Sequence, residues 1–347
     1  MERIMNTQGI WRFKDVNFSK DRGFVFSCFA CCGGSTMGYK LAGFDVVGCN
    51  EIDPEVFKIY NLNHKPRYPF VMSIRDMLKQ KTLPQELYNL DILDGSPPCT
   101  SFSTAGVRER DWGKAKRFSE GQALQRLDDL FFEFIALAQR LQPKIVVAEN
   151  VAGMVKGKAR GYVKEIIQAY DQAGYTTQLF RLNGANMGIC QARDRIFFLS
   201  VRKDLDLPKI KLNFTEDPIP FYQVEKWIAD IPDEYRKCTD YELQLWKKCK
   251  QGKSFSSVHP NQSYFNHKKI SKYKPIQTLT ASADLYHYNK PRYLSTNEYL
   301  ACSSFPLDFN FNKWIRAKKR WAMGMSVPPF MIERIANEIY RQWLSVL

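Results

Sequence analysis

The chain has 347 residues, of which 44% are hydrophobic and 25% are charged, as in ordinary soluble globular proteins. No apolar run approaches the roughly 18 residues of a membrane span. The first residues also lack the apolar core of a signal peptide, so we expect a cytoplasmic protein. Lys and Arg outnumber Asp and Glu by 51 to 36, a net charge of +15. This excess favours a polyanionic partner such as nucleic acid.

Nine cysteines without a secretory signal indicate reduced thiols rather than disulfides. Cys28, Cys31 and Cys32 form a tight cluster that could suggest zinc. No second pair of Cys or His residues completes a four-ligand site. We therefore expect packed thiols at the end of a buried strand, and no metal.

Short apolar runs in the first two thirds of the chain predict buried strands at 24–29, 45–50, 90–94 and 144–148. Apolar residues at helical spacing predict helices at 37–41, 127–141, 162–173 and 328–347. Alternating residues predict a late hairpin from 176–182 and 195–201. Strands that alternate with helices predict an α/β fold with a doubly wound, mostly parallel sheet.

The composition and periodicity of the sequence change at about Asp204. Residues 205–290 are polar, basic and rich in Tyr, Asn, Ser and Lys, with little periodicity. We expect a second, smaller and irregular domain at 205–314, and a main domain built from 1–204 and 315–347.

Several chemistry-bearing residues follow predicted strands. Gly33-Gly34 follows the first strand, Glu51 the second, Cys99 the third and Glu149 the fourth. Doubly wound sheets bind their ligands beyond the carboxyl ends of the strands, so we expect these residues at one edge. The Gly-rich turn suits close approach to a nucleotide-like ligand, and Glu51 could accept hydrogen bonds from ribose hydroxyls.

Cys99 stands in Gly95-Ser-Pro-Pro-Cys99, where two prolines force a turn at the strand's end. A thiol in that turn favours a nucleophile over an inert packing residue. Glu149-Asn-Val151 would face the same cleft, although Asn150 could instead cap a helix. The arginines of Gln191-Ala-Arg-Asp-Arg195 could bind phosphate or a pyrimidine carbonyl, or could form a solvated basic turn.

Taken in order, the Ser-Pro-Pro-Cys, Glu-Asn-Val and Gln-Ala-Arg-Asp-Arg motifs resemble those of the cytosine-5 DNA methyltransferases. The likeness covers nearly the whole chain except 205–270, the region that varies with target recognition in that family. It extends through further blocks, namely Phe29-Ala-Cys-Cys-Gly-Gly34, Leu130-Phe-Phe132, Lys274-Pro-Ile-Gln-Thr278, 292–306 and Gly324-Met-Ser-Val-Pro328.

The resemblance implies that Cys99 adds to C6 of a flipped-out cytosine while Glu149 holds or protonates N3. Arg195 would contact the ring carbonyl and Arg193 would organise the site. The methyl donor would be S-adenosyl-L-methionine, and the partner would be double-stranded DNA, bound by a monomer in the cytoplasm at the nucleoid. The implied cofactor contacts are Phe29, Ala30, Gly33, Gly34, Glu51, Ile52, Ser73, Ile74, Pro97, Leu130, Ser326 and Val327. Residues 101–116 would form a mobile catalytic loop with four cations for phosphate, namely Arg108, Arg110, Lys114 and Lys116.

Three positions depart from the family's pattern. Cys31 replaces the first Gly of Phe-x-Gly-x-Gly, Ser73 replaces an Asp that meets the adenine, and Met325 replaces an Asn. All three lie on the cofactor side. We therefore expect retained chemistry with an altered, weaker S-adenosylmethionine pocket.

The sequence is also compatible with other functions. A related branch methylates transfer RNA, but its usual Cys-Phe-Thr tripeptide is absent from the recognition region. A degenerate DNA-binding regulator without activity is a non-enzymatic alternative. Amino-methyltransferases need an aromatic residue where Cys99 stands, which disfavours them. The same motifs fit a restriction-modification role and a solitary one.

Overall fold

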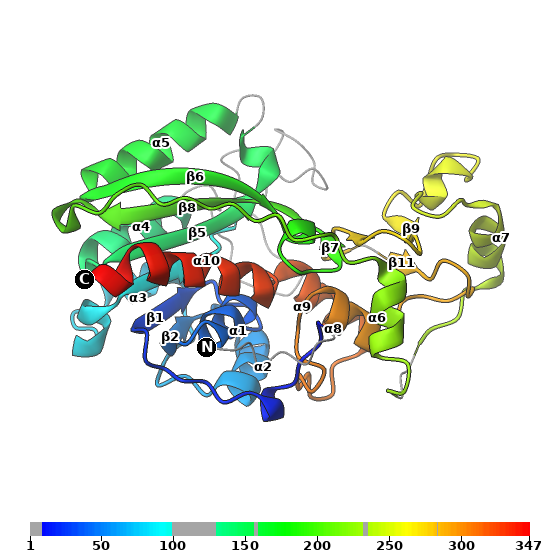
Figure 1. Cartoon of the computed structure of the whole chain (residues 1–347), viewed down its shortest axis with the longest axis horizontal. Coiled ribbons are helices and arrows are strands. Elements are labelled where there is room, and N and C mark those ends of the chain that lie inside the picture. Colours follow the sequence, from blue (N-terminus) through cyan, green and yellow to red (C-terminus); the bar gives the residue numbers. More distant parts are fainter. Residues whose placement is uncertain (1–8, 99–129, 156–158, 232–234, 283) are drawn as a thin grey trace. The chain divides into compact units, whose positions relative to one another are not determined.

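The computed structural model describes residues 9–98, 130–155, 159–231, 235–282 and 284–347 (Figure 1). The chain divides into two compact units, each assembled from three stretches. Unit 1 contains Met1–Asn17, Asn183–Arg193 and Phe214–Met331, and unit 2 contains Phe18–Leu182, Asp194–Asn213 and Ile332–Leu347. Among the described helices, none combines the length and the apolar character needed to cross a bilayer.

Unit 2 is organised around a sheet with the strand order β3-β2-β1-β4-β5-β8-β6. The strands are β1 (Phe24–Cys28), β2 (Asp45–Asn50), β3 (Tyr68–Phe70), β4 (Ile92–Gly95), β5 (Ile145–Val151), β6 (Tyr175–Asn183) and β8 (Asp194–Arg202). The pairs from β3 to β5 are parallel, and β8 runs antiparallel to β5. The predicted doubly wound, mostly parallel sheet is confirmed, and so is the pairing of the two late strands.

The helices of unit 2 flank this sheet (Figure 1). They are α1 (Gly34–Leu41), α2 (Pro54–His64), α3 (Ile74–Lys79), α4 (Leu130–Leu141), α5 (Ala159–Gln172) and the part of α10 (Pro329–Gln342) from Ile332 onward. Alternate strand residues such as Phe26, Leu93 and Val146 share one core cluster with α3, α4 and α5. The strands read as continuous apolar runs because both of their faces are covered.

Helix α2 was not predicted from the sequence, although its start carries clear signals. Asp53 caps it by accepting hydrogen bonds from the backbone N–H groups of Glu55 and Val56, and Pro54 occupies its first turn. The helix follows the strand-end carboxylate Glu51 after two residues. The helix therefore holds the backbone that directly follows Glu51 in the chain.

Unit 1 contains short elements around a small aromatic core. Its helices are α6 (Phe221–Trp227), α7 (Asp240–Lys248), α8 (Thr296–Cys302) and α9 (Arg316–Met325). Two parallel strand pairs join β7 (Gln191–Ala192) with β10 (Ile276–Gln277) and β9 (His267–Lys269) with β11 (Asp284–Tyr286). Leu245, Phe255 and Tyr286 are buried together between α7 and β11. Much of this unit is irregular, as the weak periodicity of 205–290 indicates.

Candidate active site

The turn after β1 adopts a strained backbone. Phe29 and Cys31 have φ angles of 52° and 47°, in the left-handed region that non-glycine residues rarely occupy. Gly33 follows at 87°, and a Cβ there would lie 2.2 Å from Nε2 of His64. Glycine is therefore required at position 33, both for its backbone angle and for the approach of the His64 ring. Cys31 occupies a conformation that glycine would adopt without strain.

Glu51 ties this turn to the end of β2. Its buried carboxylate accepts hydrogen bonds from the backbone N–H of Cys31 at 2.8 Å and of Asp53 at 3.0 Å. Burial raises its pKa to about 7 despite these bonds. Ala30 adds a backbone bond to Asn50, and Ile52 follows Glu51 directly. The structure thus brings the predicted cofactor residues of the first two strands together.

Ser73, at one of the departing positions, serves as the N-cap of α3. Its hydroxyl oxygen accepts a hydrogen bond from the backbone N–H of Asp76 at 3.1 Å. Asn50 holds the preceding residue by donating to the carbonyl of Met72 at 2.7 Å. Of the remaining predicted contacts in unit 2, Ile74 and Leu130 are 2% and 3% exposed and belong to the core.

Glu149 and Arg195 form an ion pair at the predicted catalytic edge. Arg195 Nε lies 2.7 Å from Glu149 Oε1, and the two side chains are only 13% and 11% exposed. The antiparallel register pairs Val151 with Arg195, which places Glu149 diagonally across from Arg195 on the same face. The structure therefore brings these two predicted site residues into direct contact.

Asn150 holds the turn that leads toward Cys99. Its amide donates to the carbonyl of Pro97 at 3.1 Å, and its oxygen accepts from the backbone N–H of Val151 at 2.8 Å. Asn150 lies within β5 and does not cap a helix. Cys99 itself lies outside the described residues. The catalytic-loop cations of 101–116 lie outside them too, namely Arg108, Arg110, Lys114 and Lys116.

Asp94 is a buried carboxylate that the sequence reasoning did not single out. It is 2% exposed and accepts hydrogen bonds from Ser27 Oγ at 2.8 Å and from Tyr39 OH at 3.2 Å. Burial raises its pKa to about 7. The only sequence signal was a carboxylate near the end of the third predicted strand, five residues before Cys99.

Arg193 belongs to unit 1 and is 2% exposed. Its guanidinium donates to the carbonyls of Leu279 at 2.9 Å and of Gly324 at 3.1 Å. It thereby holds two segments that follow it by more than 80 residues. Two predicted cofactor contacts, Ser326 and Val327, also lie in unit 1, directly after Met325, and both are buried.

The family model for the C-5 cytosine-specific DNA methylases matches residues 24–341. The chain belongs to this family. The match includes every predicted site residue, so the resemblance noted from the motifs alone is confirmed at the level of the family.

Curated relatives of this methylase chain are bacterial enzymes. The Type II methyltransferase M.NgoPII of Neisseria gonorrhoeae is 33% identical over 187 residues, which cover 53% of this chain and 49% of the relative. The Type II methyltransferase M.FnuDI of Fusobacterium nucleatum is also 33% identical, over 59% of this chain and 54% of the relative. The chain thus spans about half the length of these relatives.

Solved structures agree in fold. A crystal structure described as a DNA modification methyltransferase encoded within an Escherichia coli prophage superposes with a TM-score of 0.68. The superposition covers 92% of this chain and 99% of the other at 20% sequence identity. At that identity the likeness supports the methyltransferase fold alone.

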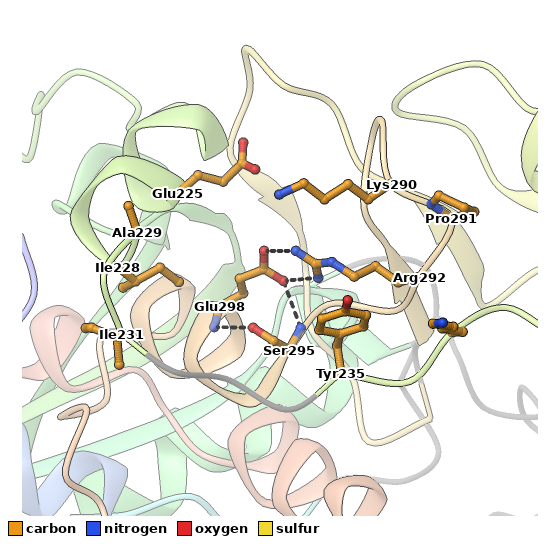
Figure 2. Close-up of a pocket in the computed structure, with 11 residues that line it drawn as sticks. Glu225, Ile228, Ala229, Ile231, Tyr235, Lys290, Pro291, Arg292, Ser295 and Glu298 are labelled. Carbon is orange, nitrogen blue, oxygen red and sulfur yellow. Dashed lines mark hydrogen bonds and ion pairs between the residues drawn. The ribbon is translucent and has the colours of Figure 1, made fainter.

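Unit 1 of this methylase chain also contains a pocket of about 630 Å³ (Figure 2). One wall is apolar, with Ile228, Ala229 and Ile231 (Figure 2). The other contains the buried ion pair of Arg292 and Glu298, in which two N···O contacts measure 2.7 Å each. Glu298 also accepts the backbone N–H of Ser295 as part of the capping box of α8. These charged groups are engaged in holding unit 1 together.

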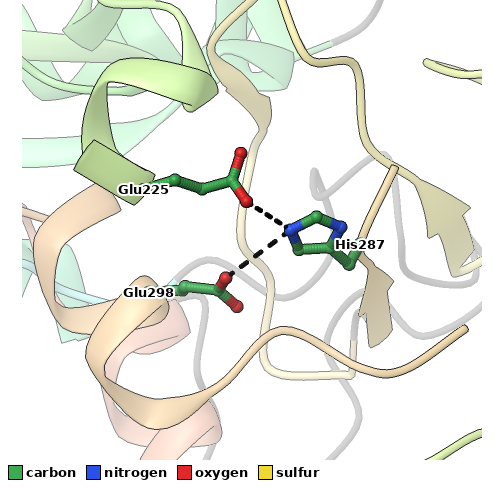
Figure 3. Close-up of side chains that lie close together, drawn as sticks. All are labelled: Glu225, His287 and Glu298. Carbon is green, nitrogen blue, oxygen red and sulfur yellow. Dashed lines mark hydrogen bonds and ion pairs between the residues drawn. The ribbon is translucent and has the colours of Figure 1, made fainter. Parts of the chain in front are cut away.

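Beside that ion pair, Glu225, His287 and Glu298 lie close enough to suggest a metal site (Figure 3). The hydrogen bonds of His287 favour another interpretation. Its Nδ1 accepts from the backbone N–H groups of Asn289 and Lys290, at 3.2 Å each, so the ring proton sits on Nε2. Nε2 then donates to Glu225 at 2.7 Å. A metal on Nε2 would move the ring proton to Nδ1, where it would face two N–H donors. The cluster is better explained as a structural hydrogen-bonded pair.

Proposed function

We propose that the chain transfers a methyl group from S-adenosylmethionine to C5 of a flipped-out cytosine in double-stranded DNA, through a covalent intermediate on Cys99. The observation that carries this proposal is the ion pair between buried Glu149 and partly buried Arg195, with a 2.7 Å contact, at the end of β5. The neighbouring Asn150 holds Pro97, two residues before Cys99. Membership in the C-5 cytosine-specific DNA methylase family supports the same chemistry.

The residues around Glu51 fit a nucleoside-containing methyl donor. A buried carboxylate that already accepts two backbone N–H groups is fixed in place and can also accept ribose hydroxyls. The strained turn at Phe29 and Cys31 is the kind of backbone that persists at ligand sites. The proposed contacts are Phe29, Ala30, Gly33, Gly34, Glu51, Ile52, Ser73, Ile74, Pro97, Leu130, Ser326 and Val327. When bound, S-adenosylmethionine supplies an electrophilic methyl group.

The protein's own groups activate the base. Cytosine C5 is a poor nucleophile until a group adds at C6, and the Cys99 thiolate forms that bond while Glu149 holds or protonates N3. Arg195 contacts the ring carbonyl, which fixes the ring against the carboxylate. Loss of the C5 proton and departure of the thiolate then restore the aromatic ring. The base must leave the duplex to reach these groups.

Arg193 acts as a positioning residue in this proposal, since its guanidinium is engaged by the carbonyls of Leu279 and Gly324. The region 205–314 reads the DNA sequence, and the chain acts as a monomer in the cytoplasm. The Type II methyltransferase relatives support a role in restriction-modification.

A side-by-side methylation assay tests the proposal. The purified chain is incubated with methyl-labelled S-adenosylmethionine and either duplex DNA or total transfer RNA, and products are mapped by bisulfite sequencing. We expect label at cytosines of one short sequence in DNA and none in RNA. Label in transfer RNA alone would assign the activity to the RNA-modifying branch, and no label in either would favour the regulator.

A further inference from the structure

Unit 1 presents one phenyl ring to solvent on an ordered loop, here called the Phe265 loop and defined as residues 254–266. Phe265 is 66% exposed, and Lys268 Nζ lies 5.8 Å from the centre of its ring. A single exposed apolar side chain is common and needs no explanation by itself. The surroundings of this one distinguish it.

Hydrogen bonds fix the backbone on both sides of Phe265. Ser254 Oγ donates to the carbonyl of Phe265 at 2.8 Å. Asn266 donates from its amide to Ser282 Oγ at 3.3 Å, and its carbonyl accepts from Asp284 at 3.1 Å. The Phe265 ring is therefore exposed to solvent while the backbone that carries it is held by hydrogen bonds.

The loop also contains backbone strain. Gln262 and Tyr264 have φ angles of 51° and 63°, in the left-handed region. His259 compensates by accepting, at Nδ1, the backbone N–H groups of Asn261 at 3.2 Å and Ser263 at 3.3 Å. Strain that the surrounding contacts maintain is often found where a loop binds a ligand.

The charge around the loop has one sign. Eight lysines and no aspartate or glutamate lie between Glu242 and Asp284 in the sequence. The backbone N–H of Lys269 bonds to the carbonyl of Lys253 at 3.0 Å, so Lys253 lies beside the strand that contains Lys268. Neither Lys253 nor Lys268 forms an ion pair with any residue that the structure describes. Unpaired cations of this kind suit a phosphate backbone.

We propose that the Phe265 loop contacts duplex DNA and that Phe265 packs against a base step as an apolar wedge. The inference rests on the proposed function in taking duplex DNA as the partner. A second copy of the chain would meet repulsion between like charges. An anionic membrane would leave unused the exposed amides of Asn261 and Gln262, which can bond base edges.

The test compares Kd values of full-length variants. Duplexes retained by the wild-type chain from a pool of random sequence supply the preferred DNA, and a scrambled duplex supplies the reference. We expect Phe265→Ala to raise the Kd for preferred DNA at least tenfold and the Kd for scrambled DNA less than threefold. The salt slope stays unchanged because no phosphate contact is lost. Lys268→Ala should instead weaken both duplexes equally and reduce the salt slope by about one.

Ile315→Ala is the matched control, since Ile315 is an apolar residue of unit 1 that is 73% exposed. Its Kd values should match wild type, and thermal melts should be the same for all variants. An unchanged ratio of the two Kd values in Phe265→Ala overturns the proposal, as does the absence of sequence preference in the wild type. Binding to phosphatidylserine vesicles that Phe265→Ala abolishes, without a change in DNA binding, overturns it too. Because binding alone is measured, failure of methyl transfer leaves this readout intact and refutes only the proposed function.

Discussion

The strand-end edge of unit 2 and the Phe265 loop of unit 1 differ in how their charged groups are buried and paired. At the strand ends, Glu51 and Glu149 are buried and each is engaged by the protein's own donors or cations. Around the loop, Lys253 and Lys268 have no acidic partner among the described residues, and Phe265 is left in solvent. Chemistry requires groups fixed in advance, whereas recognition of a polyanion requires charges left available. Changes at the strand ends should therefore alter rates, and changes at the loop should alter affinity.

The largest expected effect is that of Glu149→Gln, which keeps the shape of the side chain and removes the acid. We expect kcat to fall 10²- to 10⁴-fold, the range for a positioned general acid, while the Kd for DNA changes less than threefold. Single-turnover methylation measures the rate. Glu133→Gln is the control, because Glu133 also forms a partly buried ion pair in unit 2, with Arg75 at 3.2 Å. A similar loss in both variants would show that ion-pair loss, and not acid chemistry, is responsible.

The buried carboxylate Asp94 should make the fold less stable as the pH rises. Its pKa of about 7 in the folded state exceeds the ordinary 3.8, so the folded protein holds its proton more tightly than the unfolded chain. Stability then falls between about pH 4 and pH 7, by at most about 4 kcal/mol for a shift of this size. Glu51, also with a pKa raised to about 7, adds to the same fall.

Asp94→Asn should flatten that pH dependence, measured as the free energy of unfolding in urea at pH 5, 6, 7 and 8. Asp76→Asn is the control, because Asp76 is exposed and its lowered pKa confines its effect to more acidic solutions. In Asp94→Asn, only the part of the pH dependence that comes from Glu51 should remain. An unchanged slope in Asp94→Asn would mean that Asp94 is ionised in the folded protein across this range.

Removing the anchor of the Ser-Pro-Pro turn should have a smaller effect on rate. Asn150→Ala deletes the hydrogen bond to the carbonyl of Pro97, whose net value of 0.5–1.5 kcal/mol corresponds to about tenfold at most. We expect kcat to fall by up to about tenfold with KM unchanged, because in the proposed mechanism this turn positions the nucleophile. Asn63→Ala is matched to it, since Asn63 also donates to a carbonyl, that of Ile59 at 2.8 Å. Equal losses of activity would remove Asn150 from a positioning role.

The smallest expected effect concerns the strained turn. Cys31→Gly should raise the free energy of unfolding by about 0.5–1 kcal/mol, because glycine adopts a φ of 47° without the strain that a Cβ imposes. Cys49→Ala serves as a comparison, because removing the thiol of this buried strand residue should lower the free energy of unfolding. Destabilisation by Cys31→Gly would show that the thiol makes contacts worth more than the strain. Isothermal titration with S-adenosylmethionine checks the separate expectation that the cofactor pocket of the wild-type chain is weaker. Nanomolar binding by the wild type would contradict that expectation, and the same titration on Cys31→Gly measures the effect of residue 31.

The sheet was predictable because its strands are apolar runs that end at polar residues. Glu51 and Glu149 follow such runs, and a parallel sheet brings their carboxyl ends to one edge whatever the intervening sequence. The motif order around Cys99 then identified the family. Local periodicity and chain order sufficed for these conclusions.

Contacts between distant residues were not predictable in this way. The bonds of Arg193 to Leu279 and Gly324 span 86 and 131 residues, and no local pattern indicates such partners. The contact of Asn150 with Pro97 spans 53 residues and depends on the neighbouring positions of β4 and β5. Glu149 and Arg195 meet because of an antiparallel register that alternation alone does not set.

Covalent trapping on DNA that contains 5-fluorocytosine tests the central claim most directly. Fluorine at C5 blocks loss of the C5 substituent, so the enzyme stays attached through the nucleophile. With S-adenosylmethionine present, we predict that intact mass spectrometry finds a one-to-one protein–DNA adduct, that peptide mapping places it on Cys99, and that Cys99→Ser forms none while still binding DNA. Absence of an adduct with the wild-type chain, or an adduct that persists in Cys99→Ser, would contradict the account.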